Sequence, residues 1–364
     1  MRAGEKSVLL ISVNNFYGGG EAHLLNLAQL LAGHCDVYTL VFDPILDKRL
    51  RDAGVKVHKL SLFPRAARSL QVLHACFVLP FIIYRGRIRA VLVTGTIETL
   101  LLPIARLLGC TSISMRHLVP FLGRGSYLTR LRRLLIEMVY GFGILFADSV
   151  ICVSDTVAVQ MRRIALHNRI LVIPNWVPSI PAKSEGRGSK LPMRLLFVGR
   201  LEFNKGLHLL LQALQEMSGY ELTVVGDGSE LAHLRSLAAG RDILFCGFKS
   251  DVSHYYRNAD IFVMPSMGPE GLPLVTIEAM SYGLPCVLSD LPVHVEVSQN
   301  GTGAMLFKSG DAASLRSELQ KLMDSQRERD KVGDAAYQLV LQRHSPQVAS
   351  KAYVSALALE DPRA

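Results

Sequence analysis

The chain has 364 residues, of which 49% are hydrophobic and 20% are charged. This composition supplies material for two domain cores and excludes an intrinsically disordered protein. The net charge of +9 is divided unevenly, because residues 1–187 hold 23 Lys and Arg against 11 Asp and Glu, whereas the remaining residues hold 17 against 20. The imbalance indicates an anionic partner for the first half, such as a membrane surface, a nucleic acid or an acidic substrate. A solvated basic surface without a partner is the alternative.

The six cysteines lie far apart and form no Cys-x-x-Cys or Cys/His cluster, so neither a zinc site nor a disulfide framework is indicated, and a reducing compartment fits best. The apolar run VLLIS near the start is too short for the core of a signal peptide. The longest apolar stretch, 70–84, is interrupted by Gln71, His74 and Pro80 and falls short of the roughly 20 residues that a membrane span needs. We therefore expect a cytoplasmic protein.

Short apolar runs alternate with helical patterns from end to end, which is typical of parallel sheets with crossover helices. The first half predicts helices at 22–31 and 96–108, and strands at 7–13, 36–42, 90–94, 112–115, 150–153 and 170–173. The second half predicts strands at 194–198, 221–225, 243–245, 261–264 and 286–289. The predicted fold class is α/β with two doubly wound domains.

The segment 179–191 is rich in Pro, Gly, Ser and charged residues and has no apolar periodicity, which is typical of a linker. We therefore predict a first domain over residues 1–178 and a second domain over 192–345. Because ligands of open α/β sheets bind beyond the carboxyl ends of the strands, two such domains facing each other would hold a ligand in the cleft between them.

The most informative motif follows the predicted strand 261–264 and reads PSMGPEGLPLVTIEAMSYGLP. Pro273 suits the first position of a helix, and Gly283 followed by Pro285 suits its end. The free N–H groups and the positive dipole at the start of such a helix are typical of a diphosphate site. Glu270 precedes this helix and Glu278 lies inside it, and carboxylates are suited to accept hydrogen bonds from sugar hydroxyls. Two ordinary surface glutamates are the alternative.

A second motif, GRLEFNKG, follows the predicted strand 194–198 and carries Arg200 and Lys205 just beyond Gly199. Two cations at a strand end suit phosphate contact, whereas surface ion pairing is the alternative. In VVGDGSEL, Gly226 and Gly228 permit a close approach of the backbone, although G-x-G alone is a weak signal.

In the first half, the strand 7–13 leads into NNFYGGGEAH, where Gly18, Gly19 and Gly20 come just before a helix, an arrangement that suits phosphate. The motif is neither G-x-G-x-x-G nor a P-loop. The strand 112–115 is followed by Arg116 and His117, at an edge where ligand-binding residues gather. A purely structural histidine is equally compatible with this position.

These motifs, in this order, resemble the family 4 retaining glycosyltransferases of GT-B fold, which have two Rossmann-like domains facing a nucleotide-sugar cleft. The resemblance covers nearly the whole chain, and the E-x7-E pattern corresponds to Glu270 and Glu278. The terminal HSPQVASKAY resembles a closing helix, here within 346–364, that crosses back to the first domain. Two departures are Leu272-Pro273 in place of the commonest Phe-Gly, and Trp176 in place of Gly. The matching segments are GGGE, VIPNWV, FVGRLEFNKG, VVGDGSE, CGF, NADIFVMPS and EGLPLVTIEAMSYGLP.

The resemblance implies roles for the residues that match. Arg200 and Lys205 would neutralise the donor diphosphate, Glu278 would accept hydrogen bonds from the ribose, and Glu270 would contact the transferred sugar. His117 would line the cleft near that sugar, which makes Glu270, His117, Arg200 and Lys205 the candidate catalytic residues. The remaining candidate donor-binding residues are Gly18, Gly19, Gly20, Gly199, Gly228, Gly271, Leu272 and Leu274.

No D-x-D motif occurs, so we expect no metal and no cofactor, with the nucleotide sugar as substrate. The resemblance implies retention by front-face attack without a covalent enzyme intermediate. Cell-envelope polysaccharide or lipopolysaccharide biosynthesis is the expected role. The alternatives are a non-catalytic relative that binds nucleotide sugar and a GT-B nucleotide-sugar 2-epimerase. A nucleic-acid partner is not expected, because the chain has no helix-turn-helix, RNP or zinc signature.

Two apolar segments suggest how the acceptor is reached. In 127–146 one helical face is apolar and Arg130, Arg132 and Arg133 lie off it, with Arg124 upstream. The stretch 70–84 is flanked by Arg65, Arg68, Arg85, Arg87 and Arg89. Each is either a core helix with a solvated basic side or a helix that lies on anionic lipid. The hypothesis is a protein peripheral to the cytoplasmic face of the inner membrane, with a glycan or lipid-linked acceptor. The apolar face of 127–146 comprises Leu131, Leu134, Leu135, Met138, Phe142 and Leu145.

Overall fold

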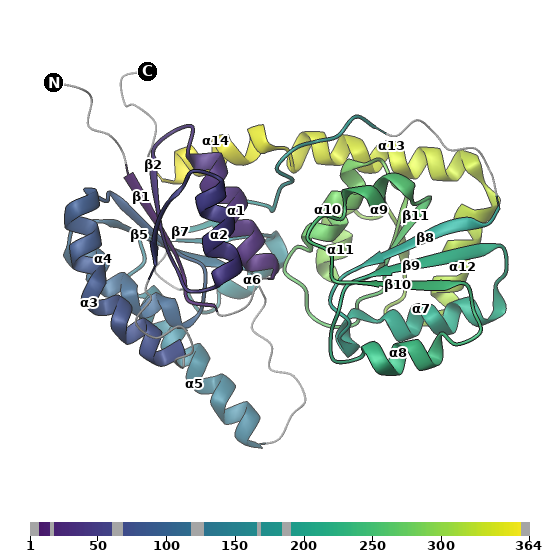
Figure 1. Ribbon diagram of the computed structural model, residues 1–364, viewed down its shortest axis with the longest axis horizontal. Helices are drawn as coiled ribbons and strands as arrows, with labels where there is room; N and C mark the ends of the chain where they lie inside the picture. The colour runs from purple at the N-terminus through teal and green to yellow at the C-terminus, as the bar shows by residue number, and fades with distance from the viewer. Residues whose placement is uncertain are drawn as a thin grey trace. The chain divides into compact units, whose positions relative to one another are not determined.

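The computed structural model describes residues 7–14, 18–59, 68–117, 127–165, 169–183 and 191–357 (Figure 1). The chain divides into two compact units, the first comprising Met1–Pro174 and Pro346–Ala364 and the second comprising Asn175–Ser345. Residues 175–178 therefore join the second unit, because Val177 N donates to His344 O at 3.1 Å and the Asn175 side chain donates to Leu272 O at 2.6 Å. Residues 184–190 of the predicted linker lie outside the described residues.

The first unit contains a seven-stranded parallel sheet in the order β3-β2-β1-β4-β5-β6-β7. The chain order reverses between β1 and β4, which lie side by side in the sheet. This pair is a topological switch point, the place where open α/β sheets bind ligands. The strands are β1 (Ser7–Ser12), β2 (Asp36–Val41), β3 (Lys56–Lys59), β4 (Ala90–Val93), β5 (Thr111–Arg116), β6 (Ser149–Cys152) and β7 (Arg169–Val172).

Two groups of helices accompany this sheet (Figure 1). Helices α3 (Arg68–Gly86), α4 (Leu102–Leu107) and α5 (Tyr127–Ile144) pack around the short 3₁₀ helix η1 (Ile97–Leu101). Helix α1 (Gly19–Leu31) packs against α2 (Pro44–Asp52) and against α14 (Pro346–Ala356), the terminal helix. Because α14 returns to α1, the end of the chain belongs to the first unit. Helix α6 (Asp155–Met161) follows β6.

The second unit repeats this design with a six-stranded parallel sheet in the order β10-β9-β8-β11-β12-β13. Its switch point lies between β8 and β11. The strands are β8 (Met193–Val198), β9 (Tyr220–Val225), β10 (Ile243–Gly247), β11 (Ile261–Met264), β12 (Cys286–Ser289) and β13 (Met305–Phe307). The helices are α7 (Leu207–Ala213), α8 (Leu231–Leu237), α9 (Ser253–Asn258), α10 (Leu274–Ser281), α11 (Pro292–Val297), α12 (Ala312–Asp324) and α13 (Gln326–Arg343), with the 3₁₀ helices η2 (Phe203–Lys205) and η3 (Leu214–Glu216).

The predicted α/β fold class is confirmed by these two parallel sheets. The prediction omitted β3 and β13, which lie at sheet edges and are short. Strand β3 reads KVHK and has too little apolar character to be recognised. Helix α10 starts beside Pro273 as predicted, with Pro273 as its N-cap in an extended backbone and Leu274 as its first helical residue.

The described part of the apolar stripe of α5 is solvent-facing, which rules out the alternative in which that stripe packs into the core. Its described members Leu134, Leu135, Met138, Phe142 and Leu145 are between 51% and 62% exposed. The buried side of α5 instead carries Tyr140 and Ile144, together with Gly143, where an added Cβ would stand 2.3 Å from Thr99 Oγ1 of η1. The side chains of Arg130, Leu131, Arg132 and Arg133 and residue Arg124 lie outside the described residues, as do Arg65 and the Arg68 side chain.

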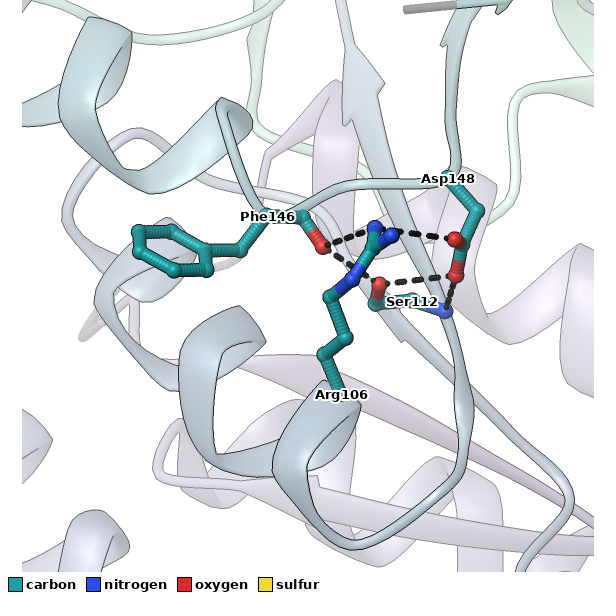
Figure 2. A network of polar contacts seen from close by, with 4 residues as sticks. All are labelled: Arg106, Ser112, Phe146 and Asp148. Carbon is teal, nitrogen blue, oxygen red and sulfur yellow. Dashed lines mark hydrogen bonds and ion pairs between the residues drawn. The ribbon is translucent and has the colours of Figure 1, made fainter.

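A polar network fixes the C-terminal end of α5 to the sheet (Figure 2). Asp148, just before β6, accepts hydrogen bonds from Ser112 N at 2.8 Å and from Arg106 at 3.0 Å. The Ser112 hydroxyl donates to Phe146 O at 2.6 Å. Since Ser112 lies at the start of β5, this network belongs to the edge opposite the carboxyl ends of the strands. It holds α5 in place independently of the apolar stripe.

None of the described helices is both long enough and apolar enough to cross a membrane.

Candidate ligand site at the strand ends

The switch point of the second unit brings together two of the predicted site residues. Lys205 is the last residue of η2, in the connection after β8, and Glu270 lies on the loop after β11; these two strands are neighbours in the sheet. Lys205 Nζ donates to Glu270 Oε1 at 2.6 Å, and both side chains are nearly buried, with 12% and 7% exposed. An ion pair of this kind at a strand-end switch point is a preorganised polar site.

Backbone contacts hold the lysine loop against the glutamate loop. Met267 N donates to Asn204 O at 2.8 Å, and Gly268 N donates to the same oxygen at 3.2 Å. Gly206 adopts φ +72°, and a Cβ there would stand 1.9 Å from Pro265 O. Only glycine permits this approach, which delivers Lys205 to Glu270.

Glu270 has a second donor, because Ser266 Oγ donates to Oε1 at 2.8 Å. Both donors therefore use the same carboxylate oxygen, and two fixed donors define the orientation of the group. The orientation leaves Oε2 for a further hydrogen-bond donor, which suits a ligand hydroxyl. Sequence reasoning missed Ser266, although its place directly after β11 and Pro265 was the available signal.

Glu278 lies in the second turn of α10 and accepts a hydrogen bond at Oε2 from the Tyr256 hydroxyl at 2.9 Å. Burial raises the pKa of Glu278 above its ordinary value, and the Tyr256 hydrogen bond opposes that shift. Burial also raises the pKa of Tyr256, so this hydroxyl stays a donor. Glu278 is thus a half-buried hydrogen-bonded carboxylate rather than an ordinary surface residue.

The loop between Glu270 and α10 is buried at Gly271 and Leu272, and Leu274 opens the helix. Asn175 holds this loop in place, because its Nδ2 donates to Leu272 O at 2.6 Å. The first N–H groups of α10 have no partner within the helix and project from its N-terminus. Asn175 lies in the segment VIPNWV that the resemblance had marked, yet its contact with a loop almost one hundred residues later is visible only in the fold.

The glycines of the neighbouring turns are required by the backbone itself. Gly226 has φ +146°, and a Cβ there would stand 1.8 Å from Gly199 O. A Cβ at Gly228 would stand 2.5 Å from Leu201 O. Packing of the β8 and β9 turns therefore explains both residues without a ligand. Arg200 follows Gly199, is exposed, and forms no ion pair within the described part of the chain.

In the first unit, the glycine motif forms the start of α1. Gly18 is the N-cap and Gly19 and Gly20 are the first helical residues, so the helix begins three residues before its predicted start. The buried Glu21 carboxylate explains this start, because its Oε2 accepts from Gly18 N at 3.0 Å and its Oε1 accepts from Asn14. A Cβ at Gly19 or Gly20 would meet no atom within 4 Å, so space is left beside the helix start.

His117 follows β5 in the same unit and is half-buried. Its ring meets the ring of His23 edge-on, with the centroids 4.8 Å apart, and its Nε2 is buried without a hydrogen-bond partner among the described residues. Burial beside the Arg116 guanidinium lowers the pKa of His117 to about 4. The imidazole is therefore neutral near pH 7. His23, whose Nε2 lies 3.1 Å from the Tyr353 hydroxyl, was missed from the sequence.

The structure thus collects Lys205, Glu270 and Glu278 in the second unit, and Gly18–Gly20 and His117 in the first. Within the described residues, no group of three or more His, Cys, Asp or Glu is arranged to hold a metal ion.

Comparison with known families gives two matches along the chain. Residues 17–179 match the family described as Glycosyltransferase Family 4, and residues 183–339 match the family described as Glycosyl transferases group 1. The two matches together cover most of the chain, and each match falls largely within one structural unit.

Individual relatives and a solved structure agree with these matches. The amylovoran biosynthesis glycosyltransferase AmsK of Erwinia amylovora is 35% identical over 156 residues, which are 39% of this chain and 38% of that protein. The phosphatidyl-myo-inositol mannosyltransferase of Mycobacterium leprae is 35% identical over 185 residues, which are 48% of this chain and 49% of that protein. The chain thus aligns with less than half of either relative. The crystal structure of Anabaena Alr3699/HepE in complex with UDP and glucose has a TM-score of 0.79 at 18% identity, over 97% of this chain and 99% of that one, and shares the fold.

Proposed function

Because the chain belongs to the family 4 glycosyltransferases, we propose that it is a retaining glycosyltransferase that moves a sugar from a UDP- or GDP-linked donor to a glycan or lipid-linked acceptor. The observation that carries the proposal is the buried Lys205–Glu270 pair at the switch point of the second unit, beside the N-terminus of α10. The HepE structure with UDP and glucose supports a nucleotide-sugar donor. The expected role is in cell-envelope polysaccharide or lipopolysaccharide biosynthesis, and the relatives named for amylovoran biosynthesis and for lipopolysaccharide core biosynthesis support it.

The proposed chemistry depends on charge at the leaving group. When the bond between the sugar and the diphosphate breaks, negative charge grows on the diphosphate while the sugar becomes oxocarbenium-like, and fixed positive groups stabilise that state. Lys205 has three N–H donors, so it can keep Glu270 and also meet a phosphate oxygen. The exposed Arg200 guanidinium and the N-terminus of α10 supply further positive ends. This set performs the task without a metal ion.

The remaining residues bind the two ends of the donor. In the proposal Glu278 accepts hydrogen bonds from the ribose, and Glu270 uses Oε2 for a hydroxyl of the transferred sugar. Gly271, Leu272 and Leu274 contribute backbone near the sugar and phosphate. In the first unit, the open space beside Gly19 and Gly20 suits a phosphate or the acceptor, and His117 has a ring nitrogen, Nε2, that no described residue engages and that a ligand hydroxyl would satisfy. The acceptor attacks from the face on which the diphosphate leaves, which retains the configuration.

The first test is a screen of UDP- and GDP-sugars by thermal shift and by transfer or hydrolysis. Lys205→Ala and Glu278→Ala are each expected to lower turnover at least tenfold while circular dichroism stays that of the wild type. Lys321→Ala is the matched control, because Lys321 forms an exposed ion pair with Glu318 on α12. Near-normal turnover in both test variants would contradict the site. Donor binding without transfer would indicate a non-catalytic relative, and release of free nucleotide with an epimerised sugar would indicate a 2-epimerase.

We further propose that the first unit docks on the cytoplasmic leaflet of an anionic membrane. The outer face of α3 carries large apolar side chains at helical spacing that are all more than half exposed, with Phe77 at 76% and Tyr84 at 88%. Helix α5 likewise carries an exposed apolar stripe, and both helices contact η1. Exposed apolar faces of this extent mark interaction sites. The α3 face comprises Leu70, Leu73, Phe77, Phe81 and Tyr84.

Positively charged residues near these faces favour an anionic lipid surface as their partner. Arg85, Arg87 and Arg89 at the end of α3 are exposed, and the Arg85 guanidinium lies 5.8 Å from the centre of the Phe81 ring. Arginines beside aromatic and aliphatic side chains suit the interface of an anionic bilayer. Co-sedimentation with phosphatidylglycerol-containing vesicles is expected and should weaken in Phe77→Ser/Phe81→Ser. Equal and negligible binding to anionic and neutral vesicles would refute the proposal, and a gel shift would reveal the nucleic-acid alternative.

A further inference from the structure

His294, on the short helix α11, is fully buried, and its Nδ1 contacts Ser289 at the end of β12. Its charge state responds to both members of the central ion pair, because Glu270 raises and Lys205 lowers the pKa of this imidazole. Burial is the largest influence and lowers that pKa to about 4, so the ring is neutral near pH 7. Neither the glutamate motif nor the lysine motif includes this residue.

Hydrogen bonds fix the tautomer of His294. Nδ1 lies 3.0 Å from Ser289 O, and a carbonyl oxygen only accepts, so Nδ1 carries the proton. Ser289 Oγ is also 3.0 Å from Nδ1, and it donates its own proton to Ser266 O at 2.6 Å. The imidazole therefore donates from Nδ1 toward Ser289, whose hydroxyl is in turn directed at Ser266.

Ser266 connects this arrangement to the site, because its hydroxyl donates to Glu270 Oε1 at 2.8 Å. Two sets of hydrogen bonds thus meet at Ser266, whose main-chain oxygen accepts from the Ser289 hydroxyl while its own hydroxyl donates to the Glu270 carboxylate. His294 and Ser289 therefore hold the backbone of Ser266, and that backbone sets where the Ser266 hydroxyl meets Glu270.

We propose that His294 is a positioning residue for Glu270, acting through Ser289 and Ser266 to orient the carboxylate so that Oε2 faces the transferred sugar. This inference rests on the proposed function, in which Glu270 contacts the sugar. The neutral ring donates from one nitrogen and transfers no proton.

The second ring nitrogen separates this role from a purely structural one. His294 Nε2 is buried and has no hydrogen-bond partner among the described residues. A buried acceptor without a donor is unfavourable, so replacing the ring by phenylalanine of similar shape removes an unfavourable group. The same replacement also removes the Nδ1–H that Ser289 accepts, so a purely structural role predicts a change in stability with binding unchanged, whereas positioning predicts a loss of sugar recognition.

The experiment measures binding by calorimetry for the nucleotide sugar that the donor screen selects and, separately, for its nucleoside diphosphate. His294→Phe is expected to weaken binding of the nucleotide sugar at least fivefold and to change binding of the diphosphate less than twofold. His294→Asn, whose amide can donate to Ser289 in place of Nδ1–H, is expected to restore most of the affinity. The double variant with Glu270→Ala is expected to bind no more weakly than Glu270→Ala alone, since residues acting through one group are not additive.

The outcomes distinguish this inference from the proposed function. If Glu270→Ala weakens binding of the nucleotide sugar and His294→Phe does not, His294 has no positioning role and the site assignment stands. If Glu270→Ala leaves the affinity unchanged, the site assignment and the positioning role both fall. Fluorescence of Trp176, the one tryptophan of the chain, which is buried in the same unit, verifies folding. Should His294→Phe not fold, Ser289→Ala removes the same connection and is judged by the same criteria.

Discussion

Two buried histidines of the second unit should make its stability depend on pH. His294 is fully buried and His344 is 4% exposed, with its Nδ1 bonded to Asn175 O at 2.7 Å. Burial lowers the pKa of each to about 4. In the unfolded chain a histidine titrates near its ordinary pKa of about 6.5. The unfolded state therefore binds more protons than the folded state below about pH 6.5, and stability falls as the pH is lowered through that window.

The size of the effect follows from the two pKa values. Lowering the pH from about 7.5 to about 5.5 protonates each unfolded histidine and leaves the folded one neutral, which removes about 1.3 kcal/mol per histidine. The pair thus accounts for about 2.5 kcal/mol, a sizeable part of the roughly 5–15 kcal/mol by which a domain is stable.

Urea titrations followed by Trp176 fluorescence test this expectation. The tryptophan lies in the unit that contains both histidines, so its signal reports their unit rather than the first one. In His294→Phe the loss of stability between the two pH values should shrink by about 1.3 kcal/mol relative to the wild type. Comparing the two proteins cancels the pH-dependent contribution of the carboxylates to the free energy of unfolding, because the same carboxylates titrate in both. An identical pH dependence in wild type and variant would refute the buried neutral imidazole.

The remaining expectations concern glycines and Glu278. Gly226→Ala should lower the free energy of unfolding of the second unit by more than about 2 kcal/mol, because the added Cβ would overlap a backbone oxygen. Gly240 also has a positive φ, of +75°, but has open space around it, so Gly240→Ala should lower the same free energy by only about 1 kcal/mol in the same urea titration. In α5, Gly141→Ala should stabilise the first unit by roughly 0.5–1 kcal/mol, because the added methyl group meets no other atom. Gly143→Ala should destabilise the same unit, because its methyl group would stand 2.7 Å from a backbone carbon of η1. Thermal melting followed by circular dichroism compares the two variants. Because burial raises the pKa of Glu278, donor affinity should begin to fall at a higher pH than an exposed glutamate would give as the pH is lowered, and Glu278→Gln should bind weakly at every pH; calorimetry across a pH series measures both.

The sequence was sufficient for the parts of the site that lie directly after a strand. In a parallel sheet all carboxyl ends meet one edge, so a motif that follows an apolar run is placed there without knowledge of packing. Lys205 and Glu270 were found in this way, and the switch point then made them neighbours. Their pairing itself was not foreseen, because two predicted cation positions were both assigned to phosphate, whereas the structure gives one of them a buried carboxylate.

The partners of the motif residues could not be read from the chain. Tyr256 precedes Glu278 by 22 residues and lies on α9, and His294 follows Glu270 by 24 residues and lies on α11. Such pairings depend on which helix packs over which strand end, and a local pattern carries no information on that. The edge strands β3 and β13 were missed for a different reason, because a short edge strand needs little apolar surface and has a weak sequence signal.

The exposed stripes of α3 and α5 show why periodicity alone left two interpretations open. In α3, Val72, Ala75 and Leu79 are buried against the sheet core, while Phe77 and Phe81 face away from it. The helix is therefore apolar on both sides, so its hydrophobic pattern does not indicate which face packs against the core. Core packing accounts only for the inner side, and the Arg106–Asp148 network together with Gly143 holds α5 without its outer side (Figure 2). Among the described residues no core contact accounts for the outer side chains, and the proposed contact with lipid would account for their apolar character.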